Sequence, residues 1–175
     1  MKNTKKITLC GMVAALAVVV MITSYFPYLT YAIPALAGLF MIVPLIECGV
    51  PWAFCTYAVT SALTLIIGEK EASILFFLLL GYYPVLKSLI ERINRQAIEW
   101  VLKLVVFNIA AVVSYYITSF VLDIQLDDFG VFGRYGALIF LIILNVVFVI
   151  YDFAISRVGT YYIISLHDKV KRFIK

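Results

Sequence analysis

The stretch ALIFLIILNVVFVI (residues 137–150) is apolar except for Asn145 and presents no polar face to water. ALAVVVMI (residues 15–22) has the same character. Over the 175 residues, 65% are apolar and 14% are charged, whereas a soluble domain has roughly a quarter charged and about half apolar residues. The sequence therefore predicts an all-α integral membrane protein, a single membrane domain over residues 1–175.

The apolar runs predict six transmembrane helices, because a span takes roughly 20 residues. We expect the spans at residues 7–26, 32–46, 50–67, 72–90, 101–122 and 137–156. The second run is short and contains Pro34, Gly38 and Pro44, which interrupt helices.

Basic residues set the predicted orientation, since cytoplasmic loops of membrane proteins are enriched in Lys and Arg. With six spans both termini share one side, and that side has twelve of the fourteen basic residues: Lys2, Lys5, Lys6, Lys87, Arg92, Arg95, Lys103, Arg157, Lys169, Lys171, Arg172 and Lys175. Only Lys70 and Arg134 fall on the other side. We expect a multi-pass plasma-membrane protein with cytoplasmic N- and C-termini. Its net charge of +4 then reflects the basic residues on the cytoplasmic side. This charge favours contact with the lipid bilayer, not with nucleic acid.

Motifs for the commonest catalytic chemistries are missing from the sequence. There is one histidine, His167, which we interpret as a solvated surface residue, and no HExxH, GxSxG or GxxxxGK[ST] pattern. The three cysteines indicate neither a disulfide nor a metal site. We expect no enzyme, no metal and no cofactor, so any uphill transport needs another subunit or an ion gradient.

Polar residues inside spans are candidate functional residues, because hydrocarbon offers them no partner. The fifth span has Asn108 and Tyr115 on one face, and the sixth has Asn145 and Asp152 on one face. The two stripes should turn toward each other or line a ligand cavity. From its depth, Asp152 is expected to anchor the inner end of its helix.

The stretch LLLGYYPVLKSLIER (residues 78–92) places Gly81, Tyr82 and Pro84 near the centre of the fourth span. Pro84 has no N–H and clashes with the carbonyl of Leu80, so it should kink the helix and free that carbonyl. The kink could open a cavity with aromatic walls, or it could be a packing feature whose phenols reach neighbouring carbonyls.

The connections contain further candidates. Tyr28 and Tyr31 follow the first span and fit either an interfacial aromatic belt or a lid over an outward-facing site. Glu69 and Arg134 lie in other loops on the same side, and Arg134 could hold a carboxylate or phosphate. On the cytoplasmic side, KSLIERINRQAIEWVLK (residues 87–103) predicts an amphipathic connector helix at the membrane surface, or a docking surface for a partner.

The first span, KKITLCGMVAALAVVV (residues 5–20), places small residues where another helix can approach closely. With six spans and cytoplasmic ends, the chain resembles the substrate-binding S component of an energy-coupling-factor transporter. In that family an Ala-xxx-Ala pattern on the first helix contacts the transmembrane coupling subunit. The resemblance implies that this face comprises Gly11, Ala14, Ala15 and Val18, with Gly11 in place of the first alanine.

The resemblance further implies a small protein that binds a vitamin or similar small-molecule nutrient from outside, while a transmembrane coupling subunit and an ATPase pair drive its release inward. By analogy, the pocket would lie in the outer halves of spans four to six, under the loop after span one. The candidate substrate-binding residues are Tyr28, Tyr31, Tyr82, Tyr115 and Asn145, with Glu69 and Arg134 at the rim. Aromatic walls with few charges suit a flat, mostly neutral heterocycle.

Two other classes remain open. Small six-span proteins that resemble the rod-shape-determining membrane proteins act as non-transporting scaffolds and need only lateral contact surfaces. A secondary carrier would need two inverted three-span halves, and the two halves of this sequence show no similarity.

Overall fold

The computed structural model describes residues 3–26, 29–122 and 136–174, and within these ranges the chain is helical with no strand. Five helical segments are long and apolar enough to cross a membrane: Asn3–Tyr25, Val50–Ile67, Lys70–Ile93, Gln96–Thr118 and Leu141–Ser165. The predicted second span is a shorter apolar segment, Ala32–Cys48. The all-helical, apolar character expected from composition is confirmed, with five full-length candidate spans.

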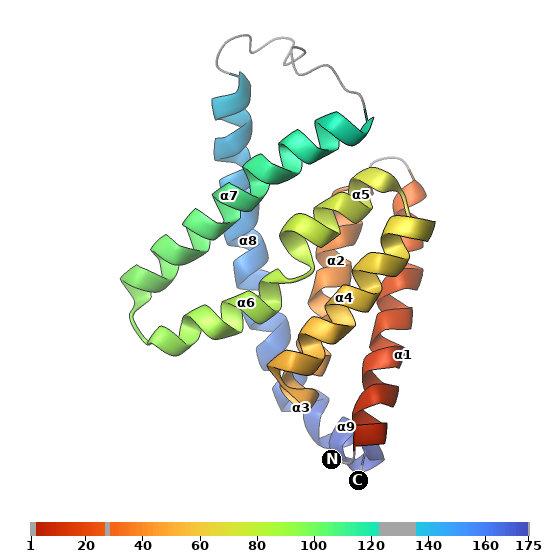
Figure 1. Cartoon of the computed structure of the whole chain (residues 1–175). Coiled ribbons are helices and arrows are strands. Elements are labelled where there is room, and N and C mark those ends of the chain that lie inside the picture. Colours follow the sequence, from red (N-terminus) through yellow and green to blue (C-terminus); the bar gives the residue numbers. More distant parts are fainter. Residues whose placement is uncertain (1–2, 27–28, 123–135, 175) are drawn as a thin grey trace.

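The helices follow one another along the chain in the order that Figure 1 shows. The α-helices are α1 (Asn3–Ile22), α2 (Ala32–Phe40), α3 (Ile42–Cys48), α4 (Val50–Ile67), α5 (Lys70–Leu75), α6 (Tyr83–Ile90), α7 (Gln96–Leu122), α8 (Gly136–Ser165) and α9 (His167–Ile174). Single turns of other helical types are η1 (Thr23–Tyr25, 3-10), η2 (Phe76–Leu80, π) and η3 (Glu91–Ile93, 3-10).

Breaks between helices fall at glycine and proline. Pro44 lies in the first turn of α3 and has no N–H to continue the hydrogen bonding of α2. Gly49 separates α3 from α4 with φ of 95°, a backbone conformation that favours glycine. Together these two residues divide what would otherwise be one long apolar helix.

Two larger buried clusters and one smaller cluster form the core of the described residues. The first joins α1, α2 and the α5–η2 segment through residues such as Ala17, Ala37 and Phe76. The second joins α3, α6, α7 and α8, and its centre includes Phe107 stacked on Phe148 with ring centroids 4.1 Å apart. The helices of the first half thus pack around α1, α2 and α4, while α6, α7 and α8 form the other half (Figure 1).

The fourth span is interrupted, as its glycine and proline predict. The π turn η2 ends where the N–H of Gly81 donates to the carbonyl of Phe76 at 2.8 Å, and α6 begins at Tyr83 with Pro84 in its first turn. A Cβ atom on Gly81 would lie 2.8 Å from that same carbonyl oxygen. The predicted kink is confirmed, and beyond it α6 turns away from the direction of α5 (Figure 1).

The segment 87–103 is not the single amphipathic helix that its four-residue spacing predicts. Helix α6 ends at Ile90, one 3-10 turn follows, and Asn94 has a left-handed conformation with φ of 55° before α7 begins at Gln96. Asparagine is among the few non-glycine residues that adopt this conformation readily. The connector is therefore a tight reversal between α6 and α7.

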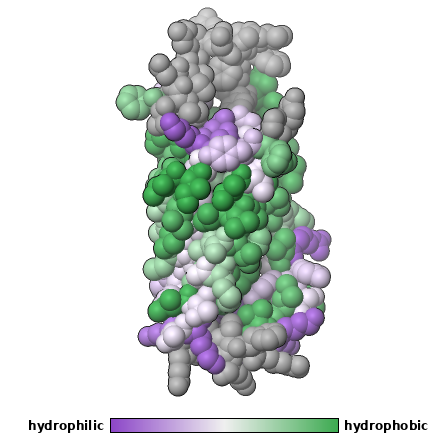
Figure 2. Space-filling model, turned by 90° about the vertical axis from the view of Figure 1, so that its right-hand side faces the viewer, coloured by the Kyte–Doolittle hydropathy of each residue, from purple (hydrophilic) through white to green (hydrophobic). Residues whose placement is uncertain are grey.

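The two ends of the chain lie at the same end of the bundle (Figure 1). Helix α8 continues to Ser165, beyond the predicted end of the sixth span at residue 156, and Val170 of α9 packs against Leu9, Cys10 and Cys48. Hydrophobic side chains cover much of the middle of the face shown in Figure 2, and hydrophilic side chains gather toward its two ends. This distribution suits a chain embedded in a bilayer.

Candidate functional site

The predicted site residues fall in three separate places. Tyr31 and Glu69 lie at the end of the bundle opposite the termini, Tyr82 lies at the kink, and Tyr115 and Asn145 lie on α7 and α8. Two further candidates, Tyr28 and Arg134, are outside the described residues.

A pocket of about 510 Å³, here called the rim pocket, lies at the end of the bundle where α4 meets α5. Its lining residues come from η1, from the end of α4, from the turn before α5 and from the start of α5: Tyr25, Leu65, Ile66, Gly68, Glu69, Lys70 and Glu71. The volume is within the range of small-molecule pockets. Two tyrosines tie the loop after α1 to this region, since Tyr25 donates to the carbonyl of Ile67 at 3.0 Å and Tyr31 donates to Glu71 Oε1 at 2.7 Å.

Glu71 also alters the acid–base chemistry of Tyr31. The phenol donates its hydrogen bond to the Glu71 carboxylate, and this bond, partial burial and the charges of Glu71 and Glu69 together raise the pKa of Tyr31 to about 12. Each of these effects disfavours the phenolate. Tyr31 is therefore a neutral hydrogen-bond donor that fastens its loop to α5.

At the kink, carbonyls of the fourth span accept hydrogen bonds from tyrosines of other helices. Tyr151 on α8 donates to the carbonyl of Leu80 at 3.0 Å, and Tyr57 on α4 donates to the carbonyl of Phe77 at 2.7 Å. The freed Leu80 carbonyl was predicted, but its partner is a phenol from another helix rather than one from the kinked segment itself. At these two carbonyls the kink makes packing contacts with neighbouring helices.

Tyr82 faces a separate apolar groove between the kinked span and α7. The groove has a volume of about 410 Å³ and is lined by Tyr57, Phe77, Leu78, Tyr82, Val106, Ile109, Ala110 and Val113. The rings of Tyr57 and Tyr82 meet edge to face with centroids 6.1 Å apart. Aromatic side chains therefore line a groove beside the kink. A third pocket of about 340 Å³ lies between the groove and the rim pocket, since it shares Phe77 and Leu78 with the groove and Leu65 and Lys70 with the rim pocket.

Asn108 and Asn145 form a reciprocal amide pair between α7 and α8. Each amide nitrogen donates to the other side-chain oxygen, at 3.0 and 2.9 Å, and each also donates to the carbonyl four residues earlier in its own helix. The two polar stripes do turn toward each other, and at this position the interaction is hydrogen bonding between helices. Tyr115 lies on the same helix as Asn108, half-buried, two turns further along.

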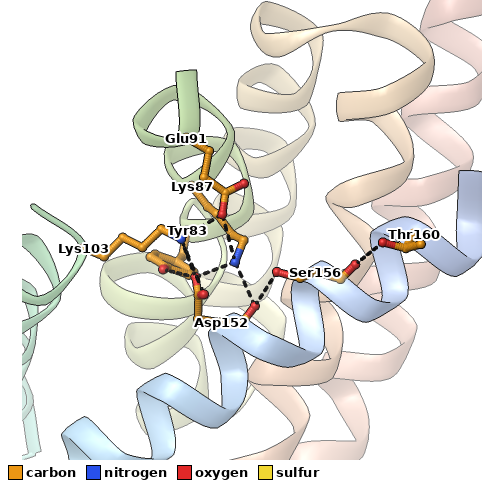
Figure 3. A network of polar contacts seen from close by, with 7 residues as sticks. All are labelled: Tyr83, Lys87, Glu91, Lys103, Asp152, Ser156 and Thr160. Atoms are coloured by element: carbon orange, nitrogen blue, oxygen red, sulfur yellow. Dashed lines mark hydrogen bonds and ion pairs between the residues drawn. The ribbon is translucent and has the colours of Figure 1, made fainter. Parts of the chain in front are cut away.

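The most concentrated polar chemistry lies where α6, α7 and α8 meet (Figure 3). Asp152 of α8 is 4% exposed, and its Oδ1 lies 2.6 Å from the Nζ of Lys87 and 3.2 Å from the Nζ of Lys103. Tyr83 donates to the same oxygen at 2.6 Å. Lys87 also donates to the backbone carbonyl of Asp152 at 2.9 Å.

A second carboxylate completes this ion cluster, which comprises Tyr83, Lys87, Glu91, Lys103 and Asp152. Glu91 Oε1 lies 2.8 Å from the Nζ of Lys103 and 3.3 Å from that of Lys87. Both lysines are 4% exposed, whereas the Glu91 side chain is 43% exposed. Two buried ammonium groups are thus balanced by one buried and one partly solvated carboxylate, a neutral arrangement that makes the burial of the charges tolerable.

The sequence pattern predicts other roles for these residues. Lys87 and Lys103 were counted among the cytoplasmic surface charges, and Asp152 was expected near the inner end of its span. Because α8 continues to Ser165, Asp152 lies near the middle of that helix instead. The sequence pattern that could have indicated this cluster is an acidic residue within an apolar helix, together with two lysines at the ends of neighbouring spans. Sequence spacing alone does not show that the three side chains meet.

The small-residue face of α1 is divided by the fold. Gly11 and Ala15 are exposed, and a Cβ atom on Gly11 would meet nothing within 4 Å. Val18 is half-buried, and Ala14 is buried in the packing of α1 against its neighbours. Ala14 therefore does not belong to an open face of α1, because it lies next to Val13 and one turn from Ala17 on the side that packs inward.

His167 is not the solvated residue that its basic surroundings suggest. Its Nδ1 lies 2.8 Å from Glu47 Oε1, and Tyr162 donates to the same oxygen at 3.0 Å. These contacts fasten the end of α8 and the start of α9 to α3. Among the described residues no three His, Cys, Asp or Glu side chains come together as metal ligands.

The chain matches no protein-family model, no curated protein and no solved structure.

Proposed function

We propose that this protein is the membrane-embedded substrate-binding subunit of an uptake system for a vitamin or a similar small nutrient, a binding protein rather than an enzyme. The observation on which the proposal rests is the rim pocket, which has the volume of a small-molecule site and an aromatic and carboxylate lining. Of the predicted substrate-binding residues, Glu69 is among the lining residues, and Tyr31 donates a hydrogen bond to the lining residue Glu71.

The proposal includes six spans with cytoplasmic termini in a plasma membrane, the segment Ala32–Cys48 being the short second span. Support comes from the twelve-to-two distribution of basic residues and from the position of both chain ends at the end of the bundle away from the rim pocket. The rim pocket then faces outward, where a nutrient arrives.

Energy for uptake would come from a separate transmembrane coupling subunit and an ATPase pair, as in the energy-coupling-factor transporters that the sequence resembles. The exposed Gly11 and Ala15 on α1 are the proposed contact for the coupling subunit, because small residues allow a partner helix to approach closely. A methyl or larger side chain on Gly11 would weaken that contact without disturbing the fold.

Native mass spectrometry of the detergent-purified protein tests the binding role. We expect a co-purified small molecule, retained less by Tyr25→Ala and Glu69→Gln because both residues line the rim pocket. Tyr161→Ala is a matched control, since Tyr161 is 65% exposed on α8 and Tyr25 is 60% exposed. No bound molecule, together with no thermal shift across a vitamin panel, would contradict the proposal and favour a non-transporting scaffold that resembles the rod-shape-determining proteins.

A further inference from the structure

The ion cluster has an uneven distribution of charge and burial. Its buried part comprises Lys87, Lys103 and Asp152, with side chains 4–5% exposed, and would bear a net charge of +1 by itself. Glu91 supplies the missing negative charge from a side chain that is 43% exposed. Among the described residues, no carboxylate besides Asp152 and Glu91 contacts either lysine.

Glu91 belongs to the least enclosed part of this region. It begins the single turn η3 (Glu91–Ile93), which ends at Asn94 in a left-handed conformation, and every side chain from Glu91 to Ile98 is exposed. By contrast, Asp152 is held on several sides. Lys87, Lys103 and Tyr83 contact its carboxylate, and Lys87 and Ser156 donate to its backbone carbonyl. The two carboxylates therefore differ in environment: the Asp152 carboxylate is buried in the core, whereas the Glu91 carboxylate reaches the lysines from the surface.

We propose that Lys87 and Lys103 form a buried binding site for a small carboxylate anion, which the protein's own Glu91 side chain occupies in this structure. Glu91 Oε1 is within 3.3 Å of both ammonium groups, so it marks where a ligand carboxylate oxygen sits. Displacement of Glu91 toward solvent leaves a buried positive charge without a counter-ion, which is strongly unfavourable until another anion enters. This site is separate from the rim pocket and does not depend on the uptake proposal.

Chemical rescue tests the site. Glu91→Ala removes the internal carboxylate and leaves space beside both lysines, so its Tm should fall and should rise again with added sodium formate, saturably and by about 2–4 °C. Sodium chloride at equal concentration controls for ionic strength. Wild type should respond to formate only at a much higher concentration than Glu91→Ala does, because formate must first displace the Glu91 side chain.

Two matched variants identify the side chains responsible for the response of Tm to formate. Lys103→Met in the Glu91→Ala background should abolish the formate response, since Asp152 then balances Lys87 and no excess charge remains. Glu99→Ala removes a nearby carboxylate that accepts a hydrogen bond from the backbone N–H of Arg95 at 3.1 Å, and this variant should respond to formate as wild type does.

If Glu91→Ala does not fold, Glu91→Gln keeps the side-chain volume while removing the charge, and it should show a smaller rise of Tm with formate. The proposal is overturned if neither variant responds to formate more than wild type does. Equal responses to formate and chloride also overturn it, because the site would then have no preference for a carboxylate.

Discussion

Gly38 lies where α2 closely approaches the kinked span and Tyr151 of α8. It lies in α2 against the kinked span, where a Cβ atom would meet the Tyr151 hydroxyl and would lie 2.7 Å from the carbonyl oxygen of Leu80. Those two atoms are themselves hydrogen-bonded to each other. The sequence analysis treated Gly38 as a helix interruption, but in the structure it lies within α2 and its lack of a side chain makes room for the contact at the kink.

We therefore expect Gly38→Ala to destabilise the protein by about 1–3 kcal/mol, because the added methyl must displace a backbone carbonyl or a buried phenol. The measurement is thermal unfolding in detergent. Gly11→Ala is the control, since that methyl meets nothing within 4 Å and alanine stabilises a helix by roughly 0.5–1 kcal/mol over glycine. Equal stability of Gly38→Ala and wild type would contradict the packing described here.

Tyr31 gives a prediction about pH. Its folded-state pKa is raised from 10.0 to about 12, chiefly by its hydrogen bond to Glu71, so the folded state holds this proton more tightly than the unfolded state. The contribution of Tyr31 to stability is therefore fully present below pH 10 and is lost as the pH rises from 10 to about 12.

Ultraviolet titration of tyrosinate absorbance measures this pKa. The wild-type spectrum minus that of Tyr31→Phe should show one phenol that ionises near pH 12. Glu71→Gln should move this ionisation toward lower pH, because the hydrogen-bonded negative charge is gone. A Tyr31 ionisation near pH 10 in wild type would show that the bond to Glu71 does not form in solution.

At the scale of helices, the contact between α7 and α8 depends on the amide pair as well as on ring stacking. Asn108 and Asn145 each donate to the other and to their own helix. Both were identified from the sequence as residues of facing stripes, because a seven-residue separation returns to the same side of a helix. The sequence left open whether a ligand or the other asparagine would be the partner.

A double-mutant cycle with Asn108→Ala and Asn145→Ala isolates the pair from the bonds that each residue makes within its own helix. Interhelical hydrogen bonds in membrane proteins contribute about 0.6 kcal/mol on average and up to about 1.7 kcal/mol. We expect a coupling energy in this range from unfolding measurements in detergent. Additive effects of the two substitutions would mean that the amides do not interact.

At the scale of the whole molecule, the number of membrane crossings determines where the chain ends lie. Five crossings would place the N- and C-termini on opposite sides, whereas six place them together. In the structure, Val170 of α9 packs near Leu9 and Cys10 of α1, and twelve of the fourteen basic residues fall on the predicted cytoplasmic side. Both observations favour a crossing by Ala32–Cys48 despite its short length.

Fusion of a fluorescent protein that matures only in the bacterial cytoplasm to either terminus tests this topology. We expect both fusions to fluoresce, because basic residues near both ends favour the cytoplasmic side. A fusion inserted between Glu69 and Lys70, on the predicted outer side, should stay dark. Detection of this fusion by antibody shows that it is expressed. Fluorescence from only one terminal fusion would contradict six crossings.

The sequence by itself indicated a lipid environment, an all-helical fold and several local features. Apolar composition excludes a water-soluble fold, and the placement of Gly81 and Pro84 fixes the kink, because those effects depend on residue type and on near neighbours along the chain. The same holds for the facing asparagine stripes. Helical periodicity is local, so it can be read from the sequence.

Only the tertiary structure decided which distant side chains meet. Lys87, Lys103 and Asp152 are separated by up to 65 residues, and no spacing rule reveals that a tight reversal at Asn94 and the length of α8 bring them together. Likewise, the partner of the freed Leu80 carbonyl comes from α8, and Ala14 faces inward because α4 and α2 pack against it. The free energy of burying a charge depends on its three-dimensional neighbours, and for that reason the ion cluster is a property of the fold.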